Sequence, residues 1–179
     1  PGLRVPLPAD KVLFDRAAKL GREVIWLHTF GERMNDGKPA GEPRLPKDRA
    51  PTIPAAHPIP TDPENFPDTL DYDPATQTLK VGTGRIENVP LAVWEYEVSG
   101  KNVLRQWFSY RKKDRSRPLI GEKRPPSELM KIQPDHWLPE YTSELINVLN
   151  VLAMLVELEP DQAALLEEIE DGPLIDAPT

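Results

Sequence analysis

The spacing of proline constrains this chain more than any other feature of its sequence. Nine prolines fall within residues 39–67, in the stretch PAGEPRLPKDRAPTIPAAHPIPTDPENFP. Proline has no backbone N–H and disfavours helix at the residue before it, so neither a helix nor a central strand fits this stretch. We expect residues 39–67 to form an extended strap over the surface. An ordinary interdomain linker is the alternative.

The segments on either side of the strap have regular hydrophobic patterns. In residues 9–30, hydrophobic side chains recur every three or four positions, which predicts an amphipathic helix that begins at Asp10 and ends near Gly31. After the strap, TLDYD and QTLKVG flank a short turn and predict a β-hairpin, with RIENV as a third strand. In AVWEYEV, residues 92–98, hydrophobic and acidic side chains alternate, which predicts a half-buried strand.

The most apolar segment is EYTSELINVLNVLAMLVEL, residues 140–158, which predicts the central core helix. Pro160 is expected to open a separate short helix that stops near Gly172. No apolar run approaches the roughly 20 residues that span a bilayer, so no membrane partner is expected. The fold class predicted from these elements is α+β, with a small, mostly antiparallel sheet packed against a long apolar helix and a proline-rich extended strap.

Positive charge is concentrated in one segment of an acidic chain. The 179 residues carry a formal net charge of −7, yet residues 101–131 hold ten basic and three acidic side chains. That segment therefore carries +7, and the remainder of the chain carries −14. Such asymmetry indicates a local site for a polyanion on a body that otherwise repels polyanions.

The first part of this segment, residues 101–113, predicts a helix with one hydrophobic and one basic face. At about 100° per residue, five hydrophobic side chains share one half of the helix, and every basic side chain except Arg111 falls outside that half. The hydrophobic half consists of Val103, Leu104, Trp107, Phe108 and Tyr110. A basic face of this kind suits the phosphates or the major groove of DNA. The alternative is a solvated helix whose charges offset the acidic body.

Two groups of side chains are candidates for DNA contact. For base edges, Asn102 and Gln106 offer amides suited to adenine, and Arg105 offers the fork suited to guanine; Lys101 lies on the same face. The candidates for phosphate contact are Lys112, Lys113, Arg115, Arg117, Lys123 and Arg124. We expect Arg105→Ala to relax sequence preference and Lys112→Ala to weaken binding to all sequences alike.

The sequence contains no recognisable catalytic or metal-binding motif. The three histidines lie far apart, and Glu95 and Glu97 have no third acid or lysine at nuclease-like spacing. Ser99–Lys101 reads SGK, but the upstream glycine of a phosphate-binding loop is missing. We therefore expect no catalytic residue, metal or cofactor in this chain, and an independent enzyme has little support. The absence of cysteine fits a cytoplasmic location.

Five stretches stand out in order along the chain: RVPLP (4–8), TLKVG (78–82), VWEYEVSGKNVLRQWFSYR (93–111), RPLIGEKRPPSEL (117–129) and HWLPEYTSELINVLNVL (136–152). Together they resemble the C-terminal specificity domain of type ISP restriction-modification enzymes, over nearly the whole chain. The shorter pattern of strand, glycine and a helix with Trp and then Arg is also similar to the tail of other adenine-N6 DNA methyltransferases with fused recognition domains.

The resemblance implies a role that the residues alone do not show. In that family, one polypeptide carries a nuclease, a helicase-like ATPase, an adenine-N6 methyltransferase and a C-terminal target-recognition domain. This chain begins at Pro1 rather than methionine and would be that last part: residues 1–38 form the N-terminal helix region, 39–67 the strap, and 68–179 the sheet, basic helix and C-terminal helices of a single target-recognition domain. Its partners would be duplex DNA and the methyltransferase domain of the same polypeptide. S-adenosylmethionine, ATP and magnesium would belong to the parent enzyme. The alternative is a docking module whose basic segment binds an acidic surface of its parent.

Overall fold

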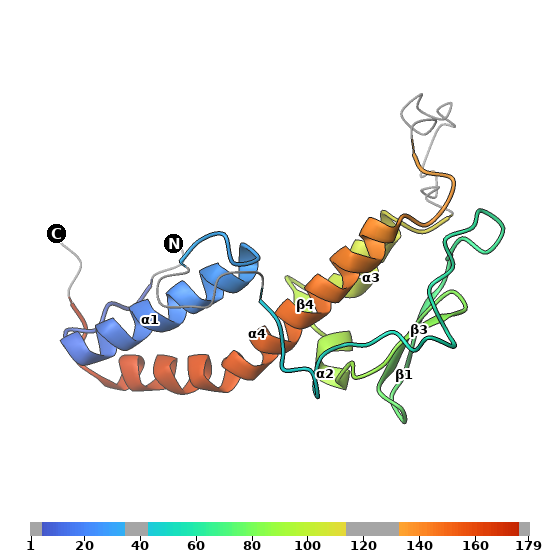
Figure 1. Cartoon of the computed structure of the whole chain (residues 1–179). Coiled ribbons are helices and arrows are strands. Elements are labelled where there is room, and N and C mark those ends of the chain that lie inside the picture. Colours follow the sequence, from blue (N-terminus) through green and yellow to red (C-terminus); the bar gives the residue numbers. More distant parts are fainter. Residues whose placement is uncertain (1–4, 35–42, 114–132, 176–179) are drawn as a thin grey trace. The chain divides into compact units, whose positions relative to one another are not determined.

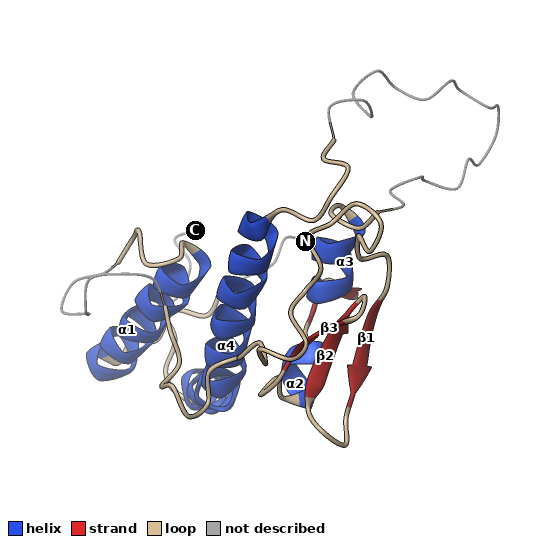
Figure 2. Ribbon diagram, turned by 45° about the vertical axis from the view of Figure 1, so that its right-hand side comes forward, coloured by secondary structure: helices blue, strands red, loops and turns tan. Residues whose placement is uncertain are grey.

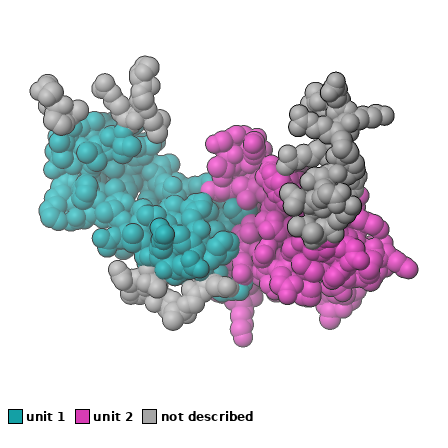
Figure 3. Space-filling view, turned by 90° about the horizontal axis from the view of Figure 1, so that it is seen from above, with its two compact units in different colours: residues 1–44, 151–179 teal, residues 45–150 magenta. Residues whose placement is uncertain are grey.

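The computed structural model describes residues 5–34, 43–113 and 133–175. The chain divides into two compact units: unit 1 comprises residues 1–44 and 151–179, and unit 2 comprises residues 45–150 (Figure 3). The long helix α4, Pro139–Asp171, contributes residues to both units. That residues 1–179 act as a single target-recognition domain stays a prediction.

Unit 1 contains helix α1, Lys11–His28, with the two ends that the sequence predicts. The Asp10 carboxylate caps the first turn by accepting the Val12 N–H at 2.7 Å. At the other end, the Phe30 N–H donates to the Leu27 carbonyl and the Gly31 N–H donates to the Trp26 carbonyl, at 3.1 and 2.9 Å. Phe30 and Gly31 have φ values of 50° and 86°, so the chain leaves the helix through a left-handed turn.

The C-terminal part of α4 belongs to the same unit as α1, and an ion pair joins the two helices. Arg16 donates to both carboxylate oxygens of Glu168, at 2.5 and 2.9 Å, and this hydrogen bonding lowers the pKa of Glu168. Beyond α4, Pro8 forms a strand bridge with Leu174. The buried side chains of the unit include Trp26, Leu27, Leu155, Leu165 and Ile169.

Unit 2 is built on a three-stranded antiparallel sheet with strand order β1–β2–β3 (Figure 2). The strands are β1, Leu70–Asp73, β2, Thr78–Val81, and β3, Gly84–Ile86. Pairing of Leu70 with Val81 and of Leu79 with Ile86 sets the register. The side chains of Leu79, Val81 and Ile86 are fully buried, because the register places them together on the core face. The predicted hairpin and third strand are confirmed.

The described part of the strap, residues 43–67, is fastened to β3 and to its following residue. Thr52 and Glu87 exchange two backbone hydrogen bonds, and the Arg85 N–H donates to the His57 carbonyl. Gly84 allows this close approach, because a Cβ there would lie 2.6 Å from the Ile59 Cα. Residues 45–67 therefore belong to unit 2 and are bonded to its sheet as the strap interpretation expects, while the passage from unit 1 to unit 2 falls between Arg44 and Leu45.

One predicted strand is wrong. Residues 92–98 do not form a single strand, because Leu91–Trp94 is the short helix α2 (Figure 1). Only Glu97–Val98, β4, is a strand, and it pairs with Lys101–Asn102, β5. Pro90 is the cause, because its carbonyl accepts the N–H groups of Val93 and Trp94 and begins a helical turn. Alternating hydrophobicity over seven residues did not reveal this proline-initiated turn.

The C-terminal helices are also not separate. α4 runs unbroken through Pro160, whose missing N–H removes one helix bond without ending the helix. By length and composition alone α4 reaches the threshold for crossing a bilayer, contrary to the expectation from the sequence. Core helices of globular proteins reach the same threshold, and α4 buries Leu145, Leu149 and Leu152 within the protein. The predicted α+β class with a long apolar helix is confirmed.

Candidate nucleic-acid interface

The basic segment begins with a tight hairpin that leads directly into helix α3, Val103–Ser109. Ser99 and Gly100 form its two-residue turn and both have positive φ, 52° and 73°, as a type I′ hairpin requires. Asn102 then caps α3: its Oδ1 accepts the Arg105 N–H at 2.9 Å, and its Nδ2 donates to the Trp94 carbonyl at 2.6 Å. The helix is therefore shorter than the predicted 101–113 and is fixed at its first turn.

The hydrophobic face of α3 anchors the helix in the core of unit 2. Leu104 is fully buried and Phe108 is 4% exposed. The Phe108 ring lies 6.1 Å from that of Trp137, a fully buried side chain whose Nε1–H donates to the Thr142 hydroxyl. Tyr110, which the helical wheel placed on the buried face, is 56% exposed because α3 ends at Ser109. The opposite face presents Arg105 to solvent.

At the start of α3, Arg105 lies on an aromatic stack. Its guanidinium is 4.8 Å from the centroid of the Trp94 ring, at cation–π distance. Trp94 in turn stacks on Tyr72 of β1, with centroids 5.5 Å apart and planes 14° from parallel. Within the described residues, neither Arg105 nor Lys101 has a carboxylate within ion-pair distance. Both charges face solvent without an acidic partner there.

At the end of α3, Arg111 has a different environment. Its guanidinium lies 4.3 Å from the Trp107 ring centroid and 5.6 Å from that of Tyr141. Two of its nitrogens donate to the Glu144 carboxylate, at 2.8 and 3.1 Å, and a third donates to the Trp107 carbonyl. Only 25% of the side chain is exposed. Arg111 therefore joins the end of α3 to α4, which explains why a basic residue falls in the hydrophobic half of the wheel.

The two lysines after Arg111 contact the end of the strap and the residue that follows it. Lys112 is 3.8 Å from Asp68, an exposed and weak ion pair. Lys113 donates through Nζ to the carbonyls of Pro63 and Glu64, at 3.3 and 3.4 Å, and through its backbone to Pro67. Both lysines therefore have partners within the chain, whereas Lys101 has no acidic partner among the described residues.

The structure brings together only some of the predicted DNA-contacting residues. Lys101, Asn102, Arg105 and Gln106 lie within the hairpin and α3, and the Gln106 amide donates to the Tyr110 hydroxyl at 2.7 Å. A base contact by Asn102 would require it to release a capping bond, so its role as a base reader stays a prediction. The others, Arg115, Arg117, Lys123 and Arg124, lie outside the described residues.

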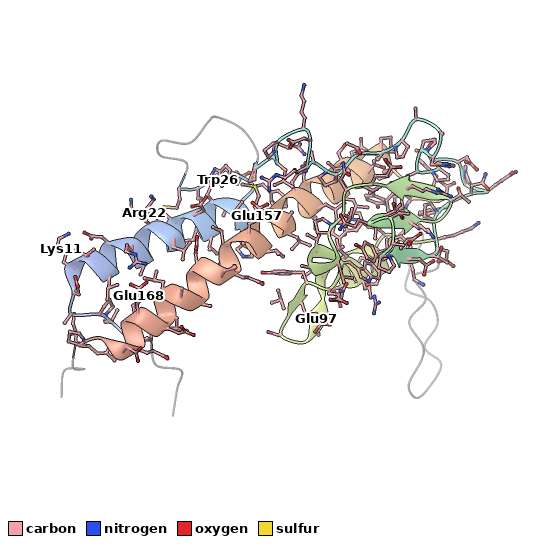
Figure 4. All side chains as sticks on the ribbon, turned by 90° about the horizontal axis from the view of Figure 1, so that it is seen from below. Lys11, Arg22, Trp26, Glu97, Glu157 and Glu168 are labelled. Carbon is pink, nitrogen blue, oxygen red and sulfur yellow. The ribbon has the colours of Figure 1, made fainter. Side chains whose placement is uncertain are left out.

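The aromatic stack was not predicted from the sequence. Trp94 was assigned to a buried strand face, and no local signal links it to Tyr72, which lies 22 positions earlier. Glu95 and Glu97 do not share a strand face, because Glu95 caps α2 while Glu97 pairs with Asn102. Figure 4 labels Glu97 in the hairpin. Among the described residues, no cluster of three or more His, Asp or Glu side chains is placed to hold a metal ion.

A protein-family model matches most of this chain. Residues 1–148 match the model of the type ISP C-terminal specificity domain. The chain belongs to this family. Comparison with curated proteins and with solved structures gives no match. Membership in the type ISP specificity-domain family assigns the chain to target recognition in restriction-modification enzymes, as part of a larger polypeptide. The matched residues include the whole of the hairpin and α3.

Proposed function

We propose that the β4–β5 hairpin and the exposed face of α3 form the surface through which this specificity domain reads duplex DNA. In this proposal Arg105 contacts base edges, and Lys101 contacts phosphate. The remaining basic residues of the segment, including those outside the described residues, add phosphate contacts. The domain then presents its target to an adenine-N6 methyltransferase in the same polypeptide.

The observation that carries the proposal is the exposed charge of Arg105, which has no carboxylate partner among the described residues, on a helix that the core holds in place. The buried side chains of Leu104 and Phe108 fix the inner face of α3, and Asn102 fixes its start. A base-reading side chain needs such support, because sites on anchored elements are more precise than sites on loops. Among side chains, arginine makes the commonest specific contact, a bidentate one with guanine.

Charge supports the same assignment. The acidic remainder of the chain repels a polyanion, so DNA would be steered to the segment that carries +7. The methyl donor S-adenosylmethionine, and the ATP and magnesium of a translocating parent, would bind in domains upstream of this one. The enzyme would act in the cytoplasm, where the host DNA is methylated.

A second function, docking to the rest of the parent enzyme, is favoured by the surface of unit 1. Most of the large hydrophobic side chains that are exposed in the described chain belong to this unit. They are Val5, Leu7, Val12, Phe14, Ile25, Phe30, Met34, Leu166, Leu174 and Ile175. If docking is the only role, replacing Phe14 and Ile25 with Gln will weaken association with the purified upstream part, and the chain alone will not bind DNA.

The DNA-reading proposal is tested by a salt titration of binding to a random-sequence duplex. We expect the logarithm of affinity to fall steeply with the logarithm of salt concentration for the wild type, because bound phosphates release counterions. In the double variant Lys101→Gln, Arg105→Gln, the slope should fall by about one to two, at roughly 0.9 for each phosphate that the protein no longer neutralises.

The matched control removes one lysine and one arginine elsewhere. Lys19 and Arg22 lie exposed on α1, and Figure 4 labels Arg22. The double variant Lys19→Gln, Arg22→Gln therefore changes net charge by the same amount. Its slope should equal that of the wild type. Equal slopes for both double variants, or no binding of the wild type at low salt, would contradict a DNA surface on the hairpin and α3.

A further inference from the structure

The aromatic pair beneath Arg105 has a geometry that bears on how the arginine would select a base. We propose that the stacked rings of Trp94 and Tyr72 are positioning residues, which hold the Arg105 guanidinium in the orientation that reads a guanine. This inference rests on the proposed function, since it assumes that Arg105 contacts DNA. It adds a determinant of specificity that itself touches no base.

The two rings form a rigid support drawn from separate parts of unit 2. Tyr72 belongs to β1, and its hydroxyl donates to the Val89 carbonyl at 2.8 Å, directly before the proline that begins α2. Trp94 is the last residue of α2 and is half-buried. The rings lie 14° from parallel with centroids 5.5 Å apart, and the Arg105 guanidinium lies 4.8 Å from the centroid of the Trp94 ring, so the tryptophan contacts both residues through its ring.

A second connection runs through the backbone. The Asn102 side chain donates to the Trp94 carbonyl and accepts the Arg105 N–H, at 2.6 and 2.9 Å. Trp94 and Arg105 are therefore joined twice, once by the amide of Asn102 and once by the contact of the guanidinium with the ring. The Asn102 bond holds the backbone of Arg105, and the contact with the Trp94 ring holds its guanidinium.

Stacking suits a base-reading arginine for a chemical reason. A guanidinium that stacks on an indole uses its flat face for that contact, while its N–H donors lie in the plane of the group and stay available. Guanine presents two acceptors, O6 and N7, to such an in-plane fork. An arginine already held in place loses less conformational freedom on binding than a solvated one, so the correct base gains more affinity.

The test uses the full chain and a randomised duplex library, with the sequences selected by the wild type as the reference. Trp94→Leu keeps a bulky side chain without a π face, and Trp94→Phe keeps a weaker π face. We expect the affinity ratio of selected to random duplex to fall about 2- to 30-fold in Trp94→Leu, the range of a cation–π contact. The ratio for Trp94→Phe should lie between those of Trp94→Leu and the wild type.

Two further measurements separate positioning from a general loss of structure. The salt slope on random duplex should stay unchanged in both Trp94 variants, because the charge of Arg105 remains. In an Arg105→Ala background, Trp94→Leu should cause no further loss of preference, since the group that it positions is gone. If Trp94→Leu does not fold, as judged by its circular dichroism, Trp94→Phe is compared with the wild type in both backgrounds.

The outcomes distinguish this inference from the proposed function. If Arg105→Ala changes the selected sequence but the Trp94 variants keep the wild-type preference, the positioning role is overturned and DNA reading stands. The same conclusion follows if Trp94 substitutions reduce preference equally with and without Arg105. If Arg105→Ala leaves the preference intact, or the wild type selects no sequence, both proposals are overturned.

Discussion

The two ends of α3 each place an arginine over a tryptophan, yet the two arginines differ in what surrounds them. At the end of the helix, Arg111 also bonds a carboxylate and a backbone carbonyl and is mostly covered. At the start, the side chain of Arg105 faces solvent, and its only contact of this kind within the described residues is with the ring of Trp94. The same pair of residue types therefore fastens the helix at one end and displays a charge at the other.

This difference shows that a basic run in a sequence is not one functional unit. Of the five basic residues in 101–113, Arg111 is bound within the fold, Lys112 pairs with Asp68, and Lys113 contacts the strap. Lys101 and Arg105 have no acidic partner among the described residues. The net charge of the segment overstates how much of it is free to attract a polyanion, and the location of each charge decides its use.

The largest effect is expected when the support beneath the end of α3 is removed. Trp137 is fully buried and touches the rings of Trp107, Phe108 and Tyr141. Trp137→Ala should lower the free energy of unfolding by about 3–5 kcal/mol, the usual cost of deleting a buried aromatic side chain. Urea denaturation measures this loss, and Trp94→Ala is the control. An equal loss in the half-buried Trp94 variant would mean that both ends are fastened alike.

The next effect compares the two arginines directly. Arg105→Ala should reduce discrimination at one base pair by about 1–3 kcal/mol and change the free energy of unfolding by only about 0.5 kcal/mol. Arg111→Ala should do the reverse, destabilising the fold by about 1–2 kcal/mol and leaving base discrimination intact. Competition between duplexes and urea denaturation provide the two readouts. If the two variants behave identically in both assays, Arg105 and Arg111 do not have separate roles in recognition and stability.

A smaller effect separates the lysines. Lys101→Gln should lower the salt slope of DNA binding by about 0.9. It removes one phosphate contact, made by a lysine that has no acidic partner among the described residues. Lys112→Ala should weaken all sequences alike but lower the slope by less, because Asp68 already offsets part of its charge. Salt titrations on random duplex compare the two. A larger change for Lys112 would place the phosphate path along the strap instead of the hairpin.

The smallest effect concerns the titration of Tyr72. Burial raises its pKa above the ordinary value of 10.0, and the charges of Asp73 and Glu95 raise it further. Because the pKa is higher in the folded than in the unfolded state, the associated stability is complete below about pH 10 and is lost as the pH rises through the folded pKa. Glu95→Gln should lower the Tyr72 pKa. The absorbance of the phenolate as a function of pH, with Tyr72→Phe as the blank, measures the pKa of Tyr72. An unchanged pKa in Glu95→Gln would mean that Glu95 lies too far from Tyr72 to affect it.

The sequence was sufficient where local rules decide structure. Asp10 and Gly31 bounded α1, the TLDYD–QTLKVG pattern located the hairpin, and the proline run located the strap. It failed at two prolines, whose effect depends on their surroundings. Pro90 turned an alternating segment into α2, and Pro160 failed to break α4 because a single missing N–H costs one bond in a long packed helix.

The candidate site was predictable only in part. The wheel placed Arg105 outward and Leu104 inward, because helical periodicity is local. The partners of each charge come from distant positions: Tyr72 beneath Trp94, Glu144 on Arg111 and Asp68 near Lys112. No spacing rule within the segment links residues that tertiary packing brings together. The sequence therefore identified the charged segment but not how its charges are divided.

The division of α3 into an anchored and an exposed face has a consequence for how such domains diversify. The residues that hold the helix, Leu104, Phe108 and Asn102, are separate from Arg105 and Gln106 on its outer surface. If the outer surface reads DNA, substitutions there would change the recognised sequence without a folding penalty. Such a domain could acquire a new target while its core stays intact, because recognition and folding would depend on different residues.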